Sequence, residues 1–329
     1  MFDFNSKNAK QWSRLGPRAM YGQFMLQLGE KCEELMVLSA DLGRSSGLDR
    51  FKSRFPKKYL SVGISEQNLI GVAAGLAREG HKVFVTSFAP FLSMRASEQI
   101  RMNLGYMEHP VNVVALGSGV SMAFLGNSHF GLEDLAIMRA IPNINISSPA
   151  DCSELGKILY DYTFNERGPS YIRLTGVPGS PQAYDDDYDY KFGEPVLMNK
   201  GSDIKVIATG SMVGQCKIAI NKFKEQGINL TLYNIHTLQN NNNKYLLDIL
   251  KTSDLIISAE EHSIIGGLGS LISEYIAQNG IKVKFKPMAL PNSFGPTGEY
   301  NYLLEHHGLT GEQIFLNIKK ILEQENLIR

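Results

Sequence analysis

The sequence predicts an α/β protein made of two consecutive doubly wound domains. Short runs rich in Val, Ile and Leu alternate with longer amphipathic runs, a Pro- and Gly-containing segment interrupts this alternation near residue 178, and the alternation then resumes. Apolar strands that alternate with helices indicate parallel sheets covered on both faces. With 329 residues, the chain is long enough for two domains that each bury a core of their own.

The first half contains the runs expected to form the larger sheet. Strands are predicted where β-branched and aliphatic residues cluster, at 36–41, 82–87, 111–117, 143–147 and 171–174. Helices are predicted where apolar residues recur at helical spacing, at 18–32, 66–79, 92–104, 132–140 and 151–165.

A change in composition separates the two halves. The segment Val177-Pro178-Gly179-Ser180-Pro181 leads into an acidic, tyrosine-rich run at 184–190, which we interpret as a solvated linker. We therefore expect domains at 1–178 and 193–329, joined by a linker at 179–192. In the second domain, the expected strands are 204–209, 230–234, 255–259 and 283–288, and the expected helices are 213–226, 245–251, 268–279, 301–307 and 311–325.

The bulk composition limits the class of partner. The formal net charge is zero, which argues against nucleic acid or an anionic membrane as the main ligand. No apolar run reaches membrane-spanning length. The cysteines at 32, 152 and 216 are scattered, so we expect them to be reduced core residues of a soluble, cytoplasmic protein.

Glu66 is the first candidate for a catalytic residue. It follows Ser65 at the start of an apolar helix rich in small residues. Burial favours the neutral form of a carboxyl group, so an acid in such a place can hold and pass a proton near neutral pH. These residues alone leave a second reading open, in which Ser65 caps the helix and Glu66 complements its dipole.

Other candidates follow the predicted strands. Ligands of open parallel sheets bind beyond the carboxyl ends of the strands, where Asp41, Phe88, Phe91 and His129 fall. Core packing remains an open reading for the two phenylalanines, as does a loop role for the histidine. The Gly-rich turn at 266–269 either holds an anion or lets a strand and helix pack closely. The sequence has no metal-ligand spacing and no dinucleotide or phosphate-binding loop.

The order of the motifs resembles the C-terminal half of transketolase, and more closely the separate C-terminal subunit of two-gene transketolases. This resemblance covers nearly the whole chain. It rests on Ser39-Ala40-Asp41-Leu42, the segment 63–68, Phe88-Ala89-Pro90-Phe91, Ser128-His129, and the segments 132–139, 142–143, 168–174, 260–269, 294–295 and 308–310. It implies a pyrimidine-binding domain with a parallel sheet at 1–178 and a smaller transketolase C-terminal domain with a mostly parallel sheet at 193–329.

The resemblance also implies a cofactor, thiamine diphosphate. Glu66 matches the glutamate that contacts N1′ of the aminopyrimidine and drives formation of the ylid. Phe88 and Phe91 match the aromatic wall against which the pyrimidine packs, and Met94 stands where a tyrosine is common. Asp41 matches an aspartate near the thiazolium. The expected activity is transfer of a two-carbon ketol unit from a ketose or ketose phosphate to an aldose.

Substrate residues are implied in the same way. His129 matches a histidine close to the reacting carbonyl and is, with Glu66, an expected catalytic residue. Arg18, Ser45 and Arg173 match positions that contact the sugar phosphate.

Three positions depart from the family pattern. Gly117 replaces a histidine, Leu125 replaces an acidic residue that recognises a substrate hydroxyl, and Phe130 stands where glutamine is frequent. A leucine leaves a substrate hydroxyl without a hydrogen bond, at a cost of about 1–3 kcal/mol. We therefore expect a less polar substrate pocket and altered discrimination among sugars.

One half of the cofactor site is missing from the sequence. Family members hold the diphosphate and Mg²⁺ with a Gly-Asp-Gly motif, which occurs nowhere in this chain. The resemblance thus implies a separate N-terminal, diphosphate-binding subunit that binds most of the Mg²⁺, and no metal site here. We expect two of each chain, self-association of this chain as a dimer, and no activity without the partner.

Three alternatives remain from the sequence. The beta component of a 2-oxo acid dehydrogenase shares the size, the layout and the glutamate. A non-catalytic partner subunit would need no buried acid. A condensing enzyme like deoxyxylulose-phosphate synthase is normally one longer chain.

Overall fold

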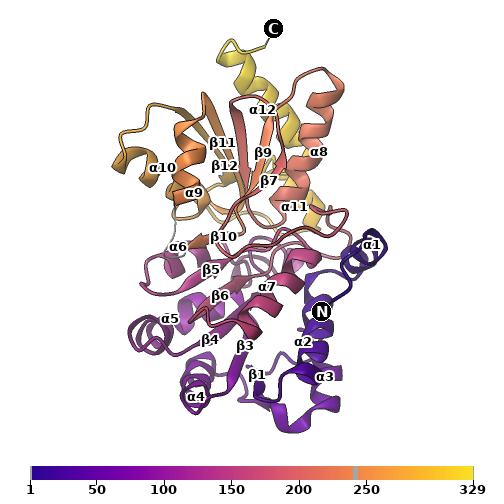
Figure 1. Cartoon of the computed structure of the whole chain (residues 1–329), viewed down its shortest axis with the longest axis vertical. Helices are drawn as coiled ribbons and strands as arrows, with labels where there is room; N and C mark the ends of the chain where they lie inside the picture. The colour runs from indigo at the N-terminus through magenta and orange to yellow at the C-terminus, as the bar shows by residue number, and fades with distance from the viewer. Residues whose placement is uncertain (1, 240–243, 329) are drawn as a thin grey trace.

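The two sheets lie one above the other along the long axis of the molecule, with helices on both faces of each (Figure 1). The computed structural model describes residues 2–239 and 244–328. The predicted fold class is confirmed, because both sheets are mostly parallel and each is covered by helices.

In the part of the chain that the structure describes, the first sheet has seven strands in the order β10-β5-β6-β4-β3-β1-β2. Every pair among β1 to β6 is parallel, and only the β10–β5 pair is antiparallel. The strands are β1 Leu35–Ser39, β2 Tyr59–Ser61, β3 Lys82–Phe88, β4 Val111–Leu116, β5 Asn145–Ser147, β6 Ser170–Arg173 and β10 Thr237–Gln239. Strand β10 comes from the second half of the chain, so the first sheet contains a strand from beyond the predicted linker.

Helices and short helical turns surround this sheet. The α-helices are α1 Ser6–Leu15, α2 Pro17–Lys31, α3 Asp49–Arg54, α4 Glu66–Arg78, α5 Ser97–Ile100, α6 Asp134–Arg139 and α7 Cys152–Phe164. The short turns are η1 Pro56–Lys58, η2 Phe91–Arg95, η3 Arg101–Tyr106 and η4 Ala123–Ser128.

The helix expected at 92–104 is not one regular helix. Its ends, η2 and η3, are π-helical, and α5 is a single short stretch between them. The backbone N–H of Ala96 bonds to the carbonyl of Phe91, five residues earlier. A π-turn fits one extra residue into a helix and is often found at functional sites.

Within the described ranges, the second sheet has five strands in the order β12-β11-β8-β9-β7, of which only β7 runs antiparallel to its neighbour. Its elements are β7 Val196–Asn199, β8 Ile204–Ala208, α8 Met212–Glu225, β9 Thr231–Asn234, α9 Lys244–Lys251, β11 Leu255–Ser263, α10 Leu268–Gln278, β12 Lys284–Leu290, α11 Tyr300–His306 and α12 Gly311–Gln324.

The part of the chain that contains the second sheet, here called the second lobe, has core residues on both faces of that sheet. The first lobe is the part that contains the first sheet. Val206 on β8 packs in the cluster that contains the apolar residues of α8 and α12. Its neighbour Ile207 packs in the cluster that contains those of α9 and α10. Successive side chains of a strand point to opposite faces, so both faces of this sheet are buried.

Each expected strand is present, whereas β2, β7 and β10, together with α1 and α3, were not predicted. The missed strands have three or four residues and lie at the edges of the sheets. A run this short carries too few residues to establish a period.

The segment interpreted as a solvated linker is partly buried, so that interpretation was wrong for its tyrosines. The rings of Tyr184 and Tyr188 stack with centroids 3.9 Å apart, and both hydroxyls donate to Glu154 on α7. Asn234 of β9 donates to the same carboxylate. The linker therefore packs between the lobes, and the domain limits 1–178 and 193–329 remain a prediction.

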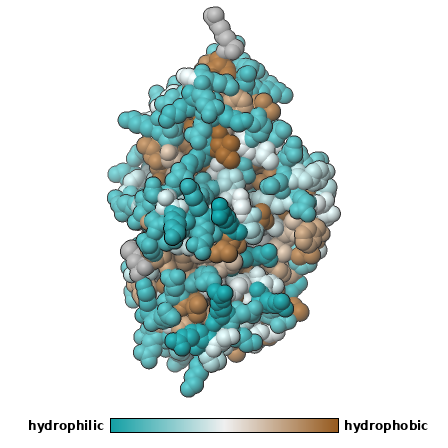
Figure 2. Space-filling model, turned by 90° about the vertical axis from the view of Figure 1, so that its right-hand side faces the viewer, coloured by the Kyte–Doolittle hydropathy of each residue, from teal (hydrophilic) through white to brown (hydrophobic). Residues whose placement is uncertain are grey.

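On the face shown in Figure 2, hydrophilic side chains predominate and hydrophobic ones occur in small groups. None of the described helices is long and apolar enough to cross a membrane. All three cysteines are buried and free, as predicted.

Candidate active site

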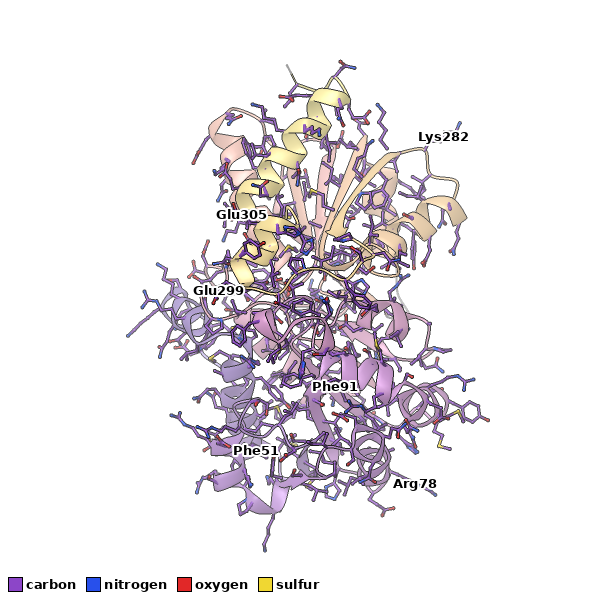
Figure 3. All side chains as sticks on the ribbon, turned by 180° about the vertical axis from the view of Figure 1, so that it is seen from behind. Phe51, Arg78, Phe91, Lys282, Glu299 and Glu305 are labelled. Atoms are coloured by element: carbon purple, nitrogen blue, oxygen red, sulfur yellow. The ribbon has the colours of Figure 1, made fainter. Side chains whose placement is uncertain are left out.

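The candidate site lies at the carboxyl end of β3, where α4, η2 and the residues after η4 converge. Phe91, which opens η2, is labelled near the middle of the molecule, in the first lobe on the side toward the second (Figure 3). The carboxyl ends of parallel strands are where open α/β sheets bind ligands, so this position agrees with the sequence-based expectation.

Glu66 is buried at the first residue of α4, with 1 % of its surface exposed. Its carboxylate points away from its own helix and across to two other elements. One oxygen accepts a hydrogen bond from the Ser87 hydroxyl at 2.9 Å, and the other lies 2.6 Å from Nη1 of Arg95. The capping reading of Ser65 was wrong, because its hydroxyl donates to the carbonyl of Val62 and no side chain caps α4.

Arg95 is a site residue that the sequence did not reveal. Its guanidinium is also centred 4.3 Å from the middle of the Phe91 ring, so it contacts both the acid and the aromatic wall. Half of its side chain is open to solvent. No partner for Glu66 was predicted from the sequence, whereas the structure supplies a charged one from a residue 29 positions away.

Three rings form the aromatic wall. Phe88, Phe91 and His129 contact one another edge to face, with centroid separations of 6.0, 5.6 and 5.4 Å. The Oγ of Ser128 lies 2.9 Å from Nδ1 of His129. The structure thus brings Glu66, both phenylalanines and the histidine together at this sheet edge, and their binding of a ligand stays a prediction.

A separate pocket of about 290 Å³ contains two of the expected substrate residues, Arg18 and Ser45. It reaches the cluster at Gly117, where a Cβ would lie 3.6 Å from the Phe88 ring. Arg44, which the sequence did not single out, lines the same pocket, as does Ser121. Among the described residues, the guanidiniums of Arg18 and Arg44 have no hydrogen-bond or ion-pair partner. Two arginine side chains of this kind favour an anionic ligand.

Gly117 lies in the lining of this pocket in the left-handed region, with φ of 69°. A Cβ at this position would come within 2.4 Å of the Met122 sulfur, so Met122 occupies the space that a side chain at 117 would need.

The remaining residues named from the sequence differ in their exposure to solvent. Met94 and Leu125 are each nearly half exposed, and Phe130 is buried. Asp41 is exposed and has a positive φ of 59°, a conformation that aspartate tolerates better than most residues.

Arg173 is not part of this pocket, which corrects its expected role as a substrate contact. Its side chain is 1 % exposed and all of its contacts are internal. Nε bonds both oxygens of Asp134, and Nη2 donates to the carbonyls of Gly131 and Glu261. A buried guanidinium with these partners cannot reach a sugar phosphate in this conformation.

Glu261, on β11 of the second lobe, connects that lobe to the loop of the pocket. Its carboxylate accepts hydrogen bonds from the backbone N–H of Val120 and from the hydroxyls of Ser211 and Tyr300. Burial raises the pKa of Glu261, and the hydrogen bonds act in the opposite direction. The sequence analysis included Glu261 only within the segment 260–269, which carries part of the family resemblance.

Glu260 decides between the two readings of the Gly-rich turn. Its oxygens accept the backbone N–H groups of Leu268 and Gly269 at 2.6 and 2.7 Å. The first turn of α10 is therefore capped by the protein's own carboxylate, which supports the close-packing reading rather than an anion site. Burial raises the pKa of Glu260 to about 7.

Two family models match the chain. "Transketolase, pyrimidine binding domain" matches residues 15–176, and "Transketolase, C-terminal domain" matches residues 193–314.

Three related proteins match over most of their length. The chain is 31 % identical to the 6-deoxy-6-sulfo-D-fructose transketolase subunit SqwH of Clostridium sp. strain MSTE9, over 98 % of each chain. It is 34 % identical to a subunit of the apulose-4-phosphate transketolase of Actinobacillus succinogenes, over 85 % of this chain and 90 % of the relative. A solved structure described as a split gene transketolase, inactive beta4 tetramer, is 31 % identical, with a TM-score of 0.82 over 94 % of this chain and 98 % of that one.

Proposed function

The chain belongs to the transketolase family, and from this membership we propose that it is the C-terminal, pyrimidine-binding subunit of a heteromeric transketolase that depends on thiamine diphosphate. The subunit names of its relatives support a separately encoded partner. The related tetramer described as inactive supports a requirement for that partner. The partner holds Mg²⁺ and the diphosphate, and the assembly contains two of each chain. The free, buried cysteines suit a reducing cytoplasm.

The observation that carries this proposal is the buried Glu66 carboxylate beside the wall of Phe88, Phe91 and His129. These side chains fit an aminopyrimidine, because a flat ring with N–H donors needs a carboxylate that accepts hydrogen bonds at its edge and an aromatic face beneath it. A planar N–H donor, the Arg95 guanidinium, already makes both contacts. These residues therefore accept a group of this shape and charge.

Each residue of the candidate site has a defined task in this proposal. Glu66 binds the ring nitrogen and holds the proton there, while Ser87 orients its carboxylate. Phe88 and Phe91 position the ring and exclude water from its face. The cofactor, once bound, supplies the carbanion chemistry that moves the two-carbon unit. In the proposed mechanism His129, beside both phenylalanines, holds the oxygen of the reacting carbonyl.

The neighbouring pocket supports an anionic sugar as the substrate of the proposed enzyme. Arg18, Arg44 and Ser45 suit an anionic group at the far end of a ketose or an aldose acceptor. The two relatives are named for a sulfonated and a phosphorylated sugar, and both sugars carry such a group. A glycolaldehyde group is thus transferred between sugars that are held by their charged ends.

Reconstitution tests the proposal. The purified chain, a separately encoded chain with the Gly-Asp-Gly motif, Mg²⁺ and thiamine diphosphate are mixed, and ketol transfer between sugar phosphates is measured. We expect activity and tight cofactor binding only with both chains, and a 2:2 assembly by analytical ultracentrifugation. Tight binding and turnover by this chain alone would contradict the divided site.

Glu66→Gln separates catalysis from a structural role in the same assay. We expect turnover to fall by about 10²–10⁴-fold while the assembly persists, because proton transfer is lost. Gln67→Ala, at the exposed neighbouring position, is the matched control and leaves turnover unchanged. Unchanged turnover in the Glu66 variant would mean a non-catalytic subunit. Release of CO₂ from a 2-oxo acid with a lipoyl acceptor would instead identify a dehydrogenase component.

A further inference from the structure

Arg95 occupies the position that the proposed cofactor needs. Its Nη1 lies 2.6 Å from one Glu66 oxygen, and its guanidinium is centred 4.3 Å from the middle of the Phe91 ring. These are the two contacts assigned above to the aminopyrimidine: an N–H donor toward the carboxylate and a flat group against the ring. The arginine and the pyrimidine therefore compete for the same place.

We propose that Arg95 is a place-holder, a positioning residue that keeps the Glu66 site formed before the cofactor binds and withdraws when it does. This inference rests on the proposed function. A guanidinium is a suitable substitute for an aminopyrimidine because it is planar, carries several N–H donors and stacks on aromatic rings. A lysine ammonium at the same position could pair with Glu66 but could not reproduce the flat stack.

The place-holder gives Glu66 a partner in the empty site. The carboxylate is almost fully buried, and without Arg95 its hydrogen bonds would come from Ser87 alone. A buried charge that lacks its partner is unfavourable, and the surrounding side chains tend to rearrange around it. Arg95 removes that cost until the cofactor replaces it.

The environment of Arg95 allows the exchange. Its side chain is 46 % exposed, and its guanidinium has no polar partner other than Glu66 among the described residues. It projects from the π-helical segment η2, whose other exposed side chain is Met94. Withdrawal into solvent therefore breaks one ion pair and one ring contact and disturbs no core packing.

Competition of this kind lowers the apparent affinity for the pyrimidine. When only a fraction of molecules has the site open, the measured dissociation constant rises by the inverse of that fraction. Removal of the arginine should therefore strengthen binding, whereas removal of an ordinary binding residue weakens it. The direction of the change distinguishes the two roles.

The test uses the full chain and a fragment, 4-amino-2,5-dimethylpyrimidine, with the dissociation constant measured by ligand-observed NMR. We expect Arg95→Met to bind the fragment about tenfold more tightly than the unmodified chain. Arg101→Met is the matched control, because Arg101 is exposed on η3 and its guanidinium contacts the Met102 sulfur. It should bind like the unmodified chain.

Glu66→Gln distinguishes failure of this inference from failure of the proposed function. If Glu66→Gln abolishes binding of the fragment, the pyrimidine binds at Glu66. With that result, equal or weaker binding by Arg95→Met overturns the place-holder and leaves the proposed function in place. Binding that is indifferent to Glu66→Gln, or undetectable in every variant and in the reconstituted complex, overturns both.

A second measurement needs no variant. In the unmodified chain, saturation with the fragment should make the Arg95 Nη–H signals exchange faster with water, because the ion pair between Nη1 and Glu66 opens. The reconstituted complex should show the same change with thiamine diphosphate. An unaltered exchange rate in the saturated protein means that Arg95 has not withdrawn, and it contradicts the proposal.

Discussion

Arg173 and Asp134 form an ion pair that is completely shielded from solvent. Nε of the arginine lies 3.0 and 2.9 Å from the two carboxylate oxygens, and the two side chains are 1 % and 0 % exposed. The Tyr171 hydroxyl donates to the same carboxylate, and the arginine reaches across to the Glu261 carbonyl on β11. One buried charge pair thus joins β6, α6 and the second lobe.

Loss of one member of this pair should be strongly destabilising. Asp134→Ala leaves the Arg173 charge buried without compensation, and we expect the free energy of unfolding to fall by about 3–5 kcal/mol in urea titrations. The control is Asp189→Ala, which breaks the exposed pair with Lys191 and should cost about 0–1 kcal/mol. Similar losses for the two variants would contradict the role given to the buried pair.

His262 should make the fold sensitive to acid. Its Nε2 accepts the backbone N–H of Leu135, so Nδ1 carries the proton and donates to the carbonyl of Ser263. Burial lowers the pKa of His262 from 6.5 to about 4. Between these values the unfolded chain binds a proton that the folded chain does not, so stability is lost as the pH falls from about 6.5 to about 4.

The measurement is urea unfolding at a series of pH values in the unmodified chain and in His262→Gln. A shift of this size amounts to about 3 kcal/mol across the window, and the glutamine variant should lack that part of the slope. Comparison of the two proteins removes the contribution of Glu260, whose raised pKa acts in the opposite direction above pH 4.5. Parallel pH profiles would show that His262 does not titrate as described.

Gly119 should not tolerate a side chain. It has a φ of 66°, and a Cβ there would lie 2.3 Å from the Glu261 carboxylate that holds Val120. Gly119→Ala should therefore lower stability by more than the ~1–2 kcal/mol that left-handed strain alone costs. Gly168→Ala has a similar φ of 75° but nothing within 4 Å, so it measures the strain alone. Equal losses of stability in the two variants would mean that the Glu261 side chain moves aside at no cost in free energy.

The two arginines of the pocket should determine affinity for anionic sugars. Arg44→Ala in the reconstituted enzyme removes one charge-assisted contact, so we expect KM for a phosphorylated donor to rise about 10- to 100-fold with kcat little changed. Arg50→Ala, at an exposed position outside the pocket, is the control and should change neither constant. A fall in kcat with constant KM would place Arg44 in the chemistry instead.

The sequence predicted the fold class because its signals are local. Apolar runs such as 111–116 and 255–259 show where buried strands lie, and the intervening periodicity shows the helices. Strand β10 could not be predicted, since its three residues carry no period and its partner β5 lies in the other half of the chain. The pairing depends on how the lobes pack, which no local pattern records.

The position of the candidate site could be predicted because the order and direction of the strands determine where their carboxyl ends meet. Glu66 was named from its place at the start of an apolar helix, and Phe88, Phe91 and His129 from the rule that ligands bind at the carboxyl ends of strands. Arg95 was missed because the π-turn of η2 changes which residues share a face, and periodicity assumes regular helix.

Arg173 was misassigned because a motif does not show which way a side chain points. On β6, Tyr171 and Arg173 lie two residues apart and both bond Asp134, so the strand's alternation directs them to the same internal partner.

The pairing of β10 with β5 has a practical consequence for anyone who divides this protein. A fragment that ends at the linker would expose β5 as an unpaired edge, and open edges recruit strands from other molecules. Recombinant first lobes cut there should polymerise or precipitate. A domain exchange that aims for a monodisperse product must therefore carry the chain through Gln239, so the lobes are best treated as a single cloning unit.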